Sequence, residues 1–297
     1  MNAALLPASG LRADFSANRL ALGALCIFGL ILIAAICAPL ISPQNPYDLA
    51  QLDILDSKLA PGAQGMSGVT FWLGTDGQGR DMLSAILYGL RISLGVGAVS
   101  TFAALAIGTA VGLVAAYAGG WLDAAIMRIV DIQLSFPSIL IALVLLTVLG
   151  QGVDKIVIAL IAVQWAYYAR TVRGATLVER HKEYVDAAVC MAYSAGRIVF
   201  RHILPNVLPP LIVVAMVQVA HAIALEATLS FLGLGLPITE PSLGLLIANG
   251  FTHLLSGKYW ISFFPGIALL VTIVSINLAG DHLRDILNPR LQSHYGA

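Results

Sequence analysis

The chain has 297 residues, of which 59% are hydrophobic and only 11% charged, and its mean hydropathy is +0.88. A soluble globular protein is much less apolar, so the composition predicts an integral membrane protein. The formal net charge is zero, so no overall field attracts nucleic acid. Cys26, Cys37 and Cys190 provide neither a disulfide framework nor a metal-binding spacing, and no cofactor or metal site is expected.

The first predicted membrane span is residues 20–41. Arg12 and Arg19 precede this apolar run, which is long enough to cross a hydrocarbon layer of about 30 Å. A cleaved signal peptide is the rival interpretation, but its apolar core would be only about 7 to 15 residues long. Residues 1–19 are therefore predicted to be a cytoplasmic tail, and the polar residues 42–90 an extracytoplasmic loop.

The loop 42–90 closes with Leu73-Gly-Thr-Asp-Gly-Gln-Gly-Arg80-Asp81, followed by Ser84, Tyr88-Gly89 and Arg91-Ile-Ser-Leu94. The glycines permit a tight turn, and Thr75, Asp76 or Asp81 can cap the next helix. An ordinary helix start would explain these residues. The stretch also resembles the LGTDxxGRDxxSxxxxGxRxSL signature of the C-type subunits of dipeptide, oligopeptide and nickel importers.

A second span is predicted at residues 92–117. It carries a stripe of small residues at every fourth position, which is typical of a helix-packing face in a membrane, within the subunit or against a partner. The stripe consists of Ser100, Ala104, Gly108, Gly112 and Ala116. A short amphipathic piece is expected at residues 121–131, a third span at 132–149, and a fourth at 155–170, interrupted by Gln164.

Residues 170–206 form a polar and basic segment between apolar runs, with six Lys or Arg residues against three Asp or Glu residues. The excess of positive charge predicts a cytoplasmic location. Tyr184 to Ala192 can form a short helix whose tip, Asp186-Ala187-Ala188, has almost no side-chain bulk and could dock on another protein. Ser194 can cap a second helix, and Pro205 fits a break or restart of the chain at the membrane.

This segment resembles the "EAA" loop of the membrane subunits of bacterial ABC importers. The resemblance rests on Glu183-Tyr184-Val185-Asp186-Ala187-Ala188, then Ala192, then His202-Ile203-Leu204-Pro205-Asn206. It implies that a coupling helix containing Glu183, Tyr184, Asp186, Ala187, Ala188 and Ala192 fits a groove in an ATPase. Asp186 stands where the family name has Glu, and Ala192 where the usual residue is Gly.

The fifth predicted span, residues 205–225, contains Gln218 and His221, with Glu226 at or beyond its outer end. Polar groups at membrane depth usually face the bundle interior or an aqueous path, so Gln164, Gln218, His221 and Glu226 are candidate translocation-path residues. For His221, a hydrogen bond to a neighbouring helix is an equally good interpretation. A final span is predicted at 260–279, before a cytoplasmic tail, 286–297.

Residues 226–244 and 277–289 also resemble the C-type family, in its external loop and its terminus. The resemblance implies an all-α type I ABC importer permease of the bacterial inner membrane, with six spans, a five-span core at 91–285 and both termini cytoplasmic. It implies no catalysis by this subunit. Membrane lipid surrounds such a subunit, and its protein partners would be a homologous permease, two ATPase subunits and an extracytoplasmic solute-binding protein.

The implied solutes are di- or oligopeptides, or alternatively nickel or another small solute such as glutathione. The sequence contains no G-x-x-x-x-G-K-[ST] phosphate loop of its own. An intramembrane hydrolase using His221 with Glu226 is a rival from another class. It is disfavoured because no second ionisable group lies plainly within a predicted span.

Overall fold

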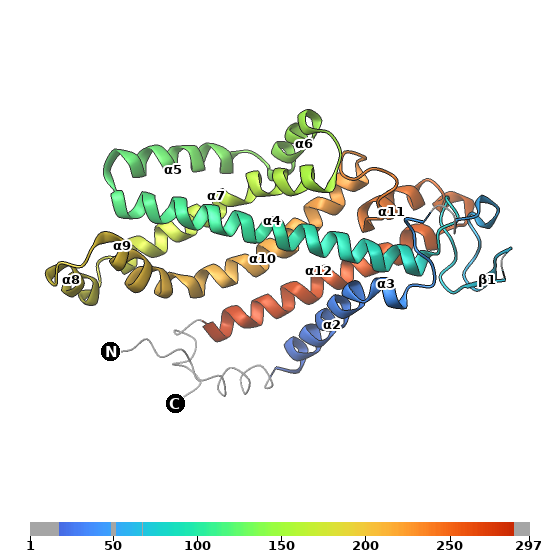
Figure 1. Ribbon diagram of the computed structural model, residues 1–297, viewed down its shortest axis with the longest axis horizontal. Helices are drawn as coiled ribbons and strands as arrows, with labels where there is room; N and C mark the ends of the chain where they lie inside the picture. Colours follow the sequence, from blue (N-terminus) through green and yellow to red (C-terminus); the bar gives the residue numbers. More distant parts are fainter. Residues whose placement is uncertain (1–17, 49–51, 67, 288–297) are drawn as a thin grey trace.

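The computed structural model describes residues 18–48, 52–66 and 68–287. They form a long helical bundle with a small loop region at one end, so the predicted all-helical fold class is confirmed (Figure 1). The elements in chain order are α2 (Arg19–Ile36), α3 (Ala38–Ile41), η2 (Ile54–Asp56), β1 (Ala63–Gln64), β2 (Thr70–Phe71), α4 (Met82–Ala118), α5 (Gly120–Ser135), α6 (Ser138–Leu149), α7 (Val153–Glu179), α8 (Glu183–Cys190), α9 (Ala195–Ile198), η3 (Val199–Ile203), α10 (Leu204–Phe231), α11 (Leu243–Phe251), η4 (Leu254–Ser256) and α12 (Trp260–Leu287). Most of the predicted tails, 1–19 and 286–297, lies outside the described residues.

The predicted first span, 20–41, consists of two helices. Asn18 caps α2, because its side-chain oxygen accepts hydrogen bonds from the amides of Leu20 at 3.1 Å and Ala21 at 3.3 Å. The chain turns at Cys37, and α3 begins with a proline in its first turn, where the missing N–H costs nothing.

The central helix, α4, has 37 residues and begins ten residues before the predicted second span. Asp81 starts it by accepting a hydrogen bond from the Ser84 amide at 2.8 Å. At 1.5 Å per residue, α4 is about 55 Å long, whereas the hydrocarbon layer is about 30 Å thick. Its first turns therefore belong to the region that the sequence predicted to be the loop 42–90.

The small residues of α4 allow a close approach to α7. The structure buries the whole stripe: Ser100, Ala104, Gly108, Gly112 and Ala116. A Cβ atom added to Gly108 would lie 2.4 Å from the Trp165 carbonyl oxygen, and one added to Gly112 would lie 2.6 Å from the Ala169 carbonyl oxygen. The helix backbones are thus in direct contact within the chain, the arrangement that glycine and alanine favour between membrane helices.

The expected boundaries of the third span, 132–149, are wrong. Helix α5 continues to Ser135 and α6 begins at Ser138, and the two meet at an angle of 92°. Phe136 is extended, because the residue before a proline avoids the helical region, and Pro137 then precedes α6. The expected amphipathic piece, 121–131, is the first part of α5 and not a separate element.

Helix α7 extends nine residues beyond the predicted end of the fourth span at Arg170. Two ion pairs attach this extension to α5. Arg173 binds Asp123 through Nη2 at 2.7 Å and Nε at 3.0 Å, and Arg170 pairs with Asp131. The predicted loop 170–206 therefore begins as helix, and the chain leaves α7 only after Glu179.

A nearly continuous helical rod, Ala195–Phe231, returns from this end. It consists of α9, the π turn η3 and α10. Ser194 occupies the N-cap position of α9, but its side chain makes no capping hydrogen bond. Pro205 does not interrupt the rod; it directly follows the π turn η3. Pro209 and Pro210 also lie inside α10, where each proline removes one backbone hydrogen bond. The rod extends six residues beyond the predicted end of the fifth span at Leu225.

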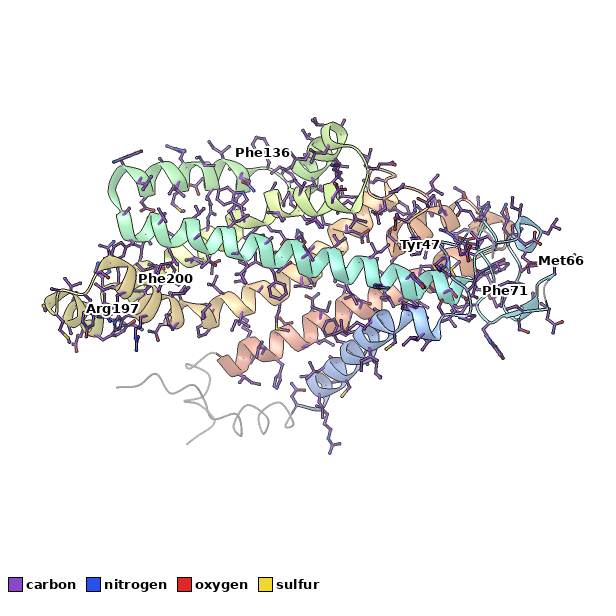
Figure 2. All side chains as sticks on the ribbon, in the orientation of Figure 1. Tyr47, Met66, Phe71, Phe136, Arg197 and Phe200 are labelled. Atoms are coloured by element: carbon purple, nitrogen blue, oxygen red, sulfur yellow. The ribbon has the colours of Figure 1, made fainter. Side chains whose placement is uncertain are left out.

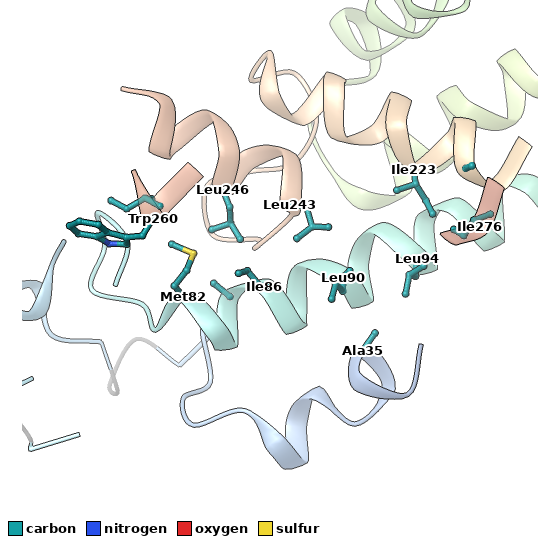
Figure 3. Close-up of a cluster of buried hydrophobic side chains, with 13 residues drawn as sticks. Ala35, Met82, Ile86, Leu90, Leu94, Ile223, Leu243, Leu246, Trp260 and Ile276 are labelled. Atoms are coloured by element: carbon teal, nitrogen blue, oxygen red, sulfur yellow. The ribbon is translucent and has the colours of Figure 1, made fainter. Parts of the chain in front are cut away.

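One end of the bundle is closed by α11, which the sequence analysis placed in an external loop. Met82, Ile86 and Leu90 on α4 face Leu243 and Leu246 on α11 in one buried cluster, to which α2, α10 and α12 also contribute (Figure 3). Glycines make the contact close. A Cβ atom at Gly244 would lie 2.1 Å from the Ala227 carbonyl oxygen of α10.

Within the described part of the chain, four helices are long and apolar enough to cross a membrane: α2, α4, the rod Ala195–Phe231 and α12. A fifth crossing results if α5 and α6 count as one bent span. Helix α7 does not pass that criterion, and it contains Gln164, Arg170 and Arg173. The six predicted crossings therefore depend on counting α7, which packs along α4 inside the bundle.

Candidate functional site

Helix α8 forms the tip of the bundle, at the end opposite β1 (Figure 1). Val185 and Ala188 point inward, where they join a buried cluster that includes Ile198 and Ile203. Asp186 and Ala187 are exposed. Apolar side chains continue this outer surface, among them Met191, which is 61% exposed.

Ala188 is only 3% exposed, so the expectation that it forms the outer tip together with Asp186 and Ala187 is wrong. Ala188 follows Val185 by three residues, which places both on the inner face of α8. The outward surface consists of Asp186 and Ala187 with the apolar residues that end the helix. A partner that docks here meets small and apolar groups with the carboxylates of Asp186 and Glu183.

Tyr184 attaches α8 to both neighbouring helices. Its hydroxyl donates to Glu179 Oε1 of α7 at 2.5 Å and accepts from Asn206 Nδ2 of α10 at 3.1 Å. The pKa of Tyr184 is raised above its ordinary value, mainly by burial and secondly by the hydrogen bond to the Glu179 carboxylate. The hydroxyl is therefore protonated at neutral pH. Lys182 also pairs with Glu179, at 2.7 Å. Glu183 is exposed and has no hydrogen bond or ion pair among the described residues.

Ala192 ends the α8 segment with φ 54°, in the left-handed region. Glycine reaches this region freely, whereas the Cβ atom of alanine makes it unfavourable. The geometry explains why the family pattern has glycine here. Arg180 closes the other side of the loop, because its Nη1 donates to the carbonyl oxygen of Ala116 at the end of α4, at 2.7 Å.

The structure separates the candidate translocation-path residues. Gln164 is fully buried, with Oε1 3.2 Å from Thr101 Oγ1 and Nε2 3.4 Å from the Gln218 carbonyl oxygen. Gln218 is also buried, and its Nε2 has no hydrogen-bond partner in the part of the chain that the structure describes. His221 is exposed, with Nε2 3.5 Å from Ser138 Oγ of α6. Gln218 and His221 therefore do not share one exposed face.

Glu226 does not lie at the outer end of its helix but inside α10, with 0% exposure. Three serine hydroxyls converge on its carboxyl group. Ser93 of α4 donates to Oε2 at 2.7 Å, Ser230 donates to Oε1 at 2.8 Å, and Ser242, which caps α11, hydrogen-bonds to the same group. The cluster joins α4, α10 and α11 without a cation among the described residues.

A cavity of about 530 Å³ lies between the 76–78 turn, the end of α10 and α11. Asp76, Gln151, Asn249 and His253 give it polar walls, and Ser230 is part of its lining. Glu226 is thus one hydrogen bond away from this cavity. Beside it, Arg80 is buried and donates to Asp76 Oδ2 at 2.7 Å, which fixes the turn that the family signature predicted.

The serine partners of Glu226 were not identified from the sequence. Ser230 follows Glu226 by four residues and is recognisable as a neighbour on one helix. Ser93 and Ser242 come from distant segments, and only the tertiary packing of α4 and α11 brings them there. The hydrogen bond between Tyr47 and Glu240 was missed for the same reason. Burial, and then Glu240, raise the pKa of Tyr47.

Comparison with known proteins identifies the family of the chain. Residues 108–293 match the family described as binding-protein-dependent transport system inner membrane component, and residues 10–61 match the N-terminal TM domain of oligopeptide transport permease C. The chain belongs to this family of transport permeases. It is a multi-pass protein of the inner membrane and a C-type permease subunit of an ABC importer.

Two named relatives cover nearly the whole chain. The dipeptide transport system permease protein DppC of Alkalihalophilus pseudofirmus is 37% identical over 93% of this chain and 88% of its own length. A putative peptide permease protein of Brucella suis is 38% identical over 97% of this chain and 94% of its own. The inward-facing MetNI methionine ABC transporter shares the fold, with a TM-score of 0.58 and 21% identity over 70% of this chain and 98% of that one.

Proposed function

We propose that this permease carries di- or oligopeptides across the cytoplasmic membrane. The observation that supports this most is the match along almost the entire chain to relatives named as dipeptide and peptide permeases. The proposed partners are a second, homologous permease, two ATPase subunits and an extracytoplasmic solute-binding protein. ATP hydrolysis belongs to the ATPase subunits, and this subunit converts their closure into movement of its helices.

The proposed orientation has six crossings, with the α8 end and both termini in the cytoplasm. The bases of 170–206 favour it, since cytoplasmic segments are enriched in Lys and Arg. In this orientation Asp186 and Ala187 face the ATPase. Force applied there passes to α7 and α10 through Tyr184, because one hydroxyl bonds to both helices.

The intramembrane hydrolase is disfavoured by the positions of its two required groups. His221 lies near Ser138, whereas Glu226 is enclosed by serine hydroxyls. A general base must lie within hydrogen-bond reach of the group that it activates. His221 and Glu226 have different partners and therefore do not form such a pair.

The solute is tested in a strain that lacks this subunit and is complemented with the gene. We expect uptake of labelled dipeptides or longer peptides to be lost in the strain and restored by complementation, while uptake of nickel and glutathione stays unchanged. Restoration of nickel or glutathione uptake without any change in peptide uptake would contradict the peptide assignment. Depletion of an ATPase subunit provides the control, because it should remove the same uptake.

A further inference from the structure

A second cavity, of about 280 Å³, lies on the side of the bundle between α4, the start of α7 and the segment after α3. Tyr47, Tyr88 and Arg91 line its upper part, and Gly95 and Val153 belong to its lower, apolar part. Figure 2 places Tyr47 beside α4, in the half of the bundle that also contains Phe71 and Met66. The cavity lies outside the coupling loop and outside the Glu226 cluster.

The guanidinium of Arg91 is available for a ligand. Arg91 is exposed, and none of the ion pairs among the described residues involves it. The carboxylate of Glu240 helps to raise the pKa of Tyr47, and Glu240 is not part of the cavity lining. The Tyr47 and Tyr88 rings meet edge to face, with centroids 5.5 Å apart, and form a rigid wall beside the cation.

Below Arg91, the same side of α4 is apolar and exposed. Gly95, Val99 and Phe102 follow at spacings of four, four and three, which places all of them on one helical face. Gly95 leaves open space, with no heavy atom within 4 Å of an added Cβ, and Phe102 is 66% exposed. From Arg91 to Phe102 the helix rises about 16 Å, close to half of a hydrocarbon layer about 30 Å thick.

We propose that this surface binds one anionic phospholipid, with its phosphate on Arg91 and an acyl chain that leaves the cavity at Gly95 and follows the exposed face of α4 to Phe102. A guanidinium is suited to this role, since its fork of N–H groups matches phosphate oxygens and it binds them in pairs. Tyrosine rings favour the boundary between head groups and hydrocarbon, which is the position that the proposed lipid requires of Tyr47 and Tyr88. In the proposed orientation, the lipid belongs to the outer leaflet.

The lining of the cavity favours a lipid over a peptide. A bound peptide must find hydrogen-bond partners for its buried amide groups, because an unpaired buried amide is costly. Below the guanidinium, the side chains of Ile92, Val96 and Val153 and the bare Gly95 offer none. An acyl chain makes no such demand, so a cavity with polar groups at one end and apolar residues at the other suits a phospholipid.

The test uses the assembled transporter, purified in nanodiscs that contain phosphatidylglycerol in phosphatidylcholine, with bound lipid measured by native mass spectrometry. We expect Arg91→Gln to reduce the retained phosphatidylglycerol about tenfold, because it removes the charge-assisted hydrogen bonds to the phosphate. Arg19→Gln, which removes the same charge from the start of α2, should retain the lipid as the unmodified complex does. Equal retention in Arg91→Gln and in the unmodified complex would overturn the proposal.

A second variant leaves the charge in place. Gly95→Leu fills the open space below the head group, and we expect it also to reduce phosphatidylglycerol retention. If Arg91→Gln fails to assemble, Gly95→Leu tests the lipid site in its place. Unchanged retention in Gly95→Leu would then reject the site. A peptide is the alternative ligand of this cavity. Comparing the uptake of peptides with a free and with an amidated carboxyl end tests for it. If Arg91→Gln raises KM only for the free carboxylates and leaves lipid retention unchanged, the cavity binds solute and the lipid site is wrong.

Discussion

At the scale of single residues, two adjacent alanines of α8 have opposite environments. Ala187 faces outward, while Ala188 packs on the buried cluster below the helix. Bulk at Ala188 would therefore displace α8 from its own subunit, and a loss of activity there would say nothing about a partner. Only the outward position tests the proposed contact with the ATPase.

We expect Ala187→Trp to leave the subunit inserted and folded but to weaken its contact with the ATPase. A large side chain forced into a close-packed interface costs about 1 to 3 kcal/mol. The measurements are co-purification of the ATPase subunits and the ratio of peptide uptake to ATP hydrolysis, both of which should fall. Ala60→Trp, at an exposed alanine at the other end of the bundle, is the control. Normal uptake with fully bound ATPases would show that α8 does not make this contact.

Ala192→Gly should stabilise the turn after α8. Alanine in the left-handed region costs roughly 1 to 2 kcal/mol, and glycine removes most of this strain. Hydrogen exchange of the amides in residues 184–203 should slow accordingly. Ala187→Gly provides an opposite control, since glycine inside a helix lowers stability by about 0.5 to 1 kcal/mol. Faster exchange in Ala192→Gly would contradict the strain at this position.

At the scale of elements, glycine determines which helices can approach. Gly108 and Gly112 bring α4 onto the backbone of α7, and Gly244 brings α11 onto α10. Neither contact has room for a Cβ atom. The buried Glu226 carboxyl group joins α4 to α10 by hydrogen bonds, and Ser242, which caps α11, interacts with the same group. Close backbone packing and buried polar contacts therefore both hold the closed end of the bundle.

Gly108→Val should destabilise the packing of α4 against α7. Its Cβ atom would lie 2.4 Å from a carbonyl oxygen and 2.5 Å from Tyr168 Cβ, so the helices must separate. Overpacking of this kind costs about 1 to 3 kcal/mol, and we expect a lower midpoint of thermal unfolding in detergent. Gly174→Val, on the open face of α7, is the matched control. An unchanged midpoint in Gly108→Val would mean that the two helices are not in contact.

Glu226→Leu should loosen α11 from α4 and α10, whereas Glu226→Gln should have a smaller effect. Leucine leaves buried serine hydroxyls without an acceptor, at about 1 to 3 kcal/mol for each unsatisfied group, while glutamine retains an acceptor oxygen. Limited proteolysis within residues 232–257 measures the loosening. If both variants are cleaved as slowly as the unmodified protein, the cluster does not hold α11.

At the scale of the whole molecule, the two ends of the bundle differ in kind. One end carries the loop region and α11, and the other carries α8 on the extensions of α7 and α10 (Figure 1). The basic residues gather at the α8 end. This asymmetry is what the proposed orientation requires of a subunit that receives solute at one end and force at the other.

Single cysteines at Gln64 and Lys182 should label from opposite sides of the membrane. The background must lack Cys26, Cys37 and Cys190, because Cys26 and Cys190 are exposed. Membrane-impermeant maleimide applied to whole cells or to inverted vesicles gives the measurement, and Gln64 should react in cells and Lys182 in inverted vesicles. Labelling of both positions in the same preparation would contradict an odd number of crossings between them.

The apolar runs and the small-residue stripe made much of this arrangement predictable. The composition of the chain shows which segments are membrane helices. The angle of the bend at Pro137 also depends on how α5 and α6 pack, and the pattern of apolar residues along the sequence does not reveal this packing. The burial of Ala188 was missed because a short polar loop gives no sign of which helical face turns inward. Glu226 was assigned to a helix end because Ser93 and Ser242, which satisfy it, lie far away in sequence.

The unbroken rod Ala195–Phe231 has a mechanical consequence. It begins beside α8 and ends at the cavity under α11, and 37 residues at 1.5 Å each make it about 55 Å long. A rigid lever of this length, tilted by about 10° around its midpoint, moves each end by about 5 Å in opposite directions. A shift of that size at the coupling loop would reach the other end of the rod in full if the π turn η3, Pro209 and Pro210 keep their geometry.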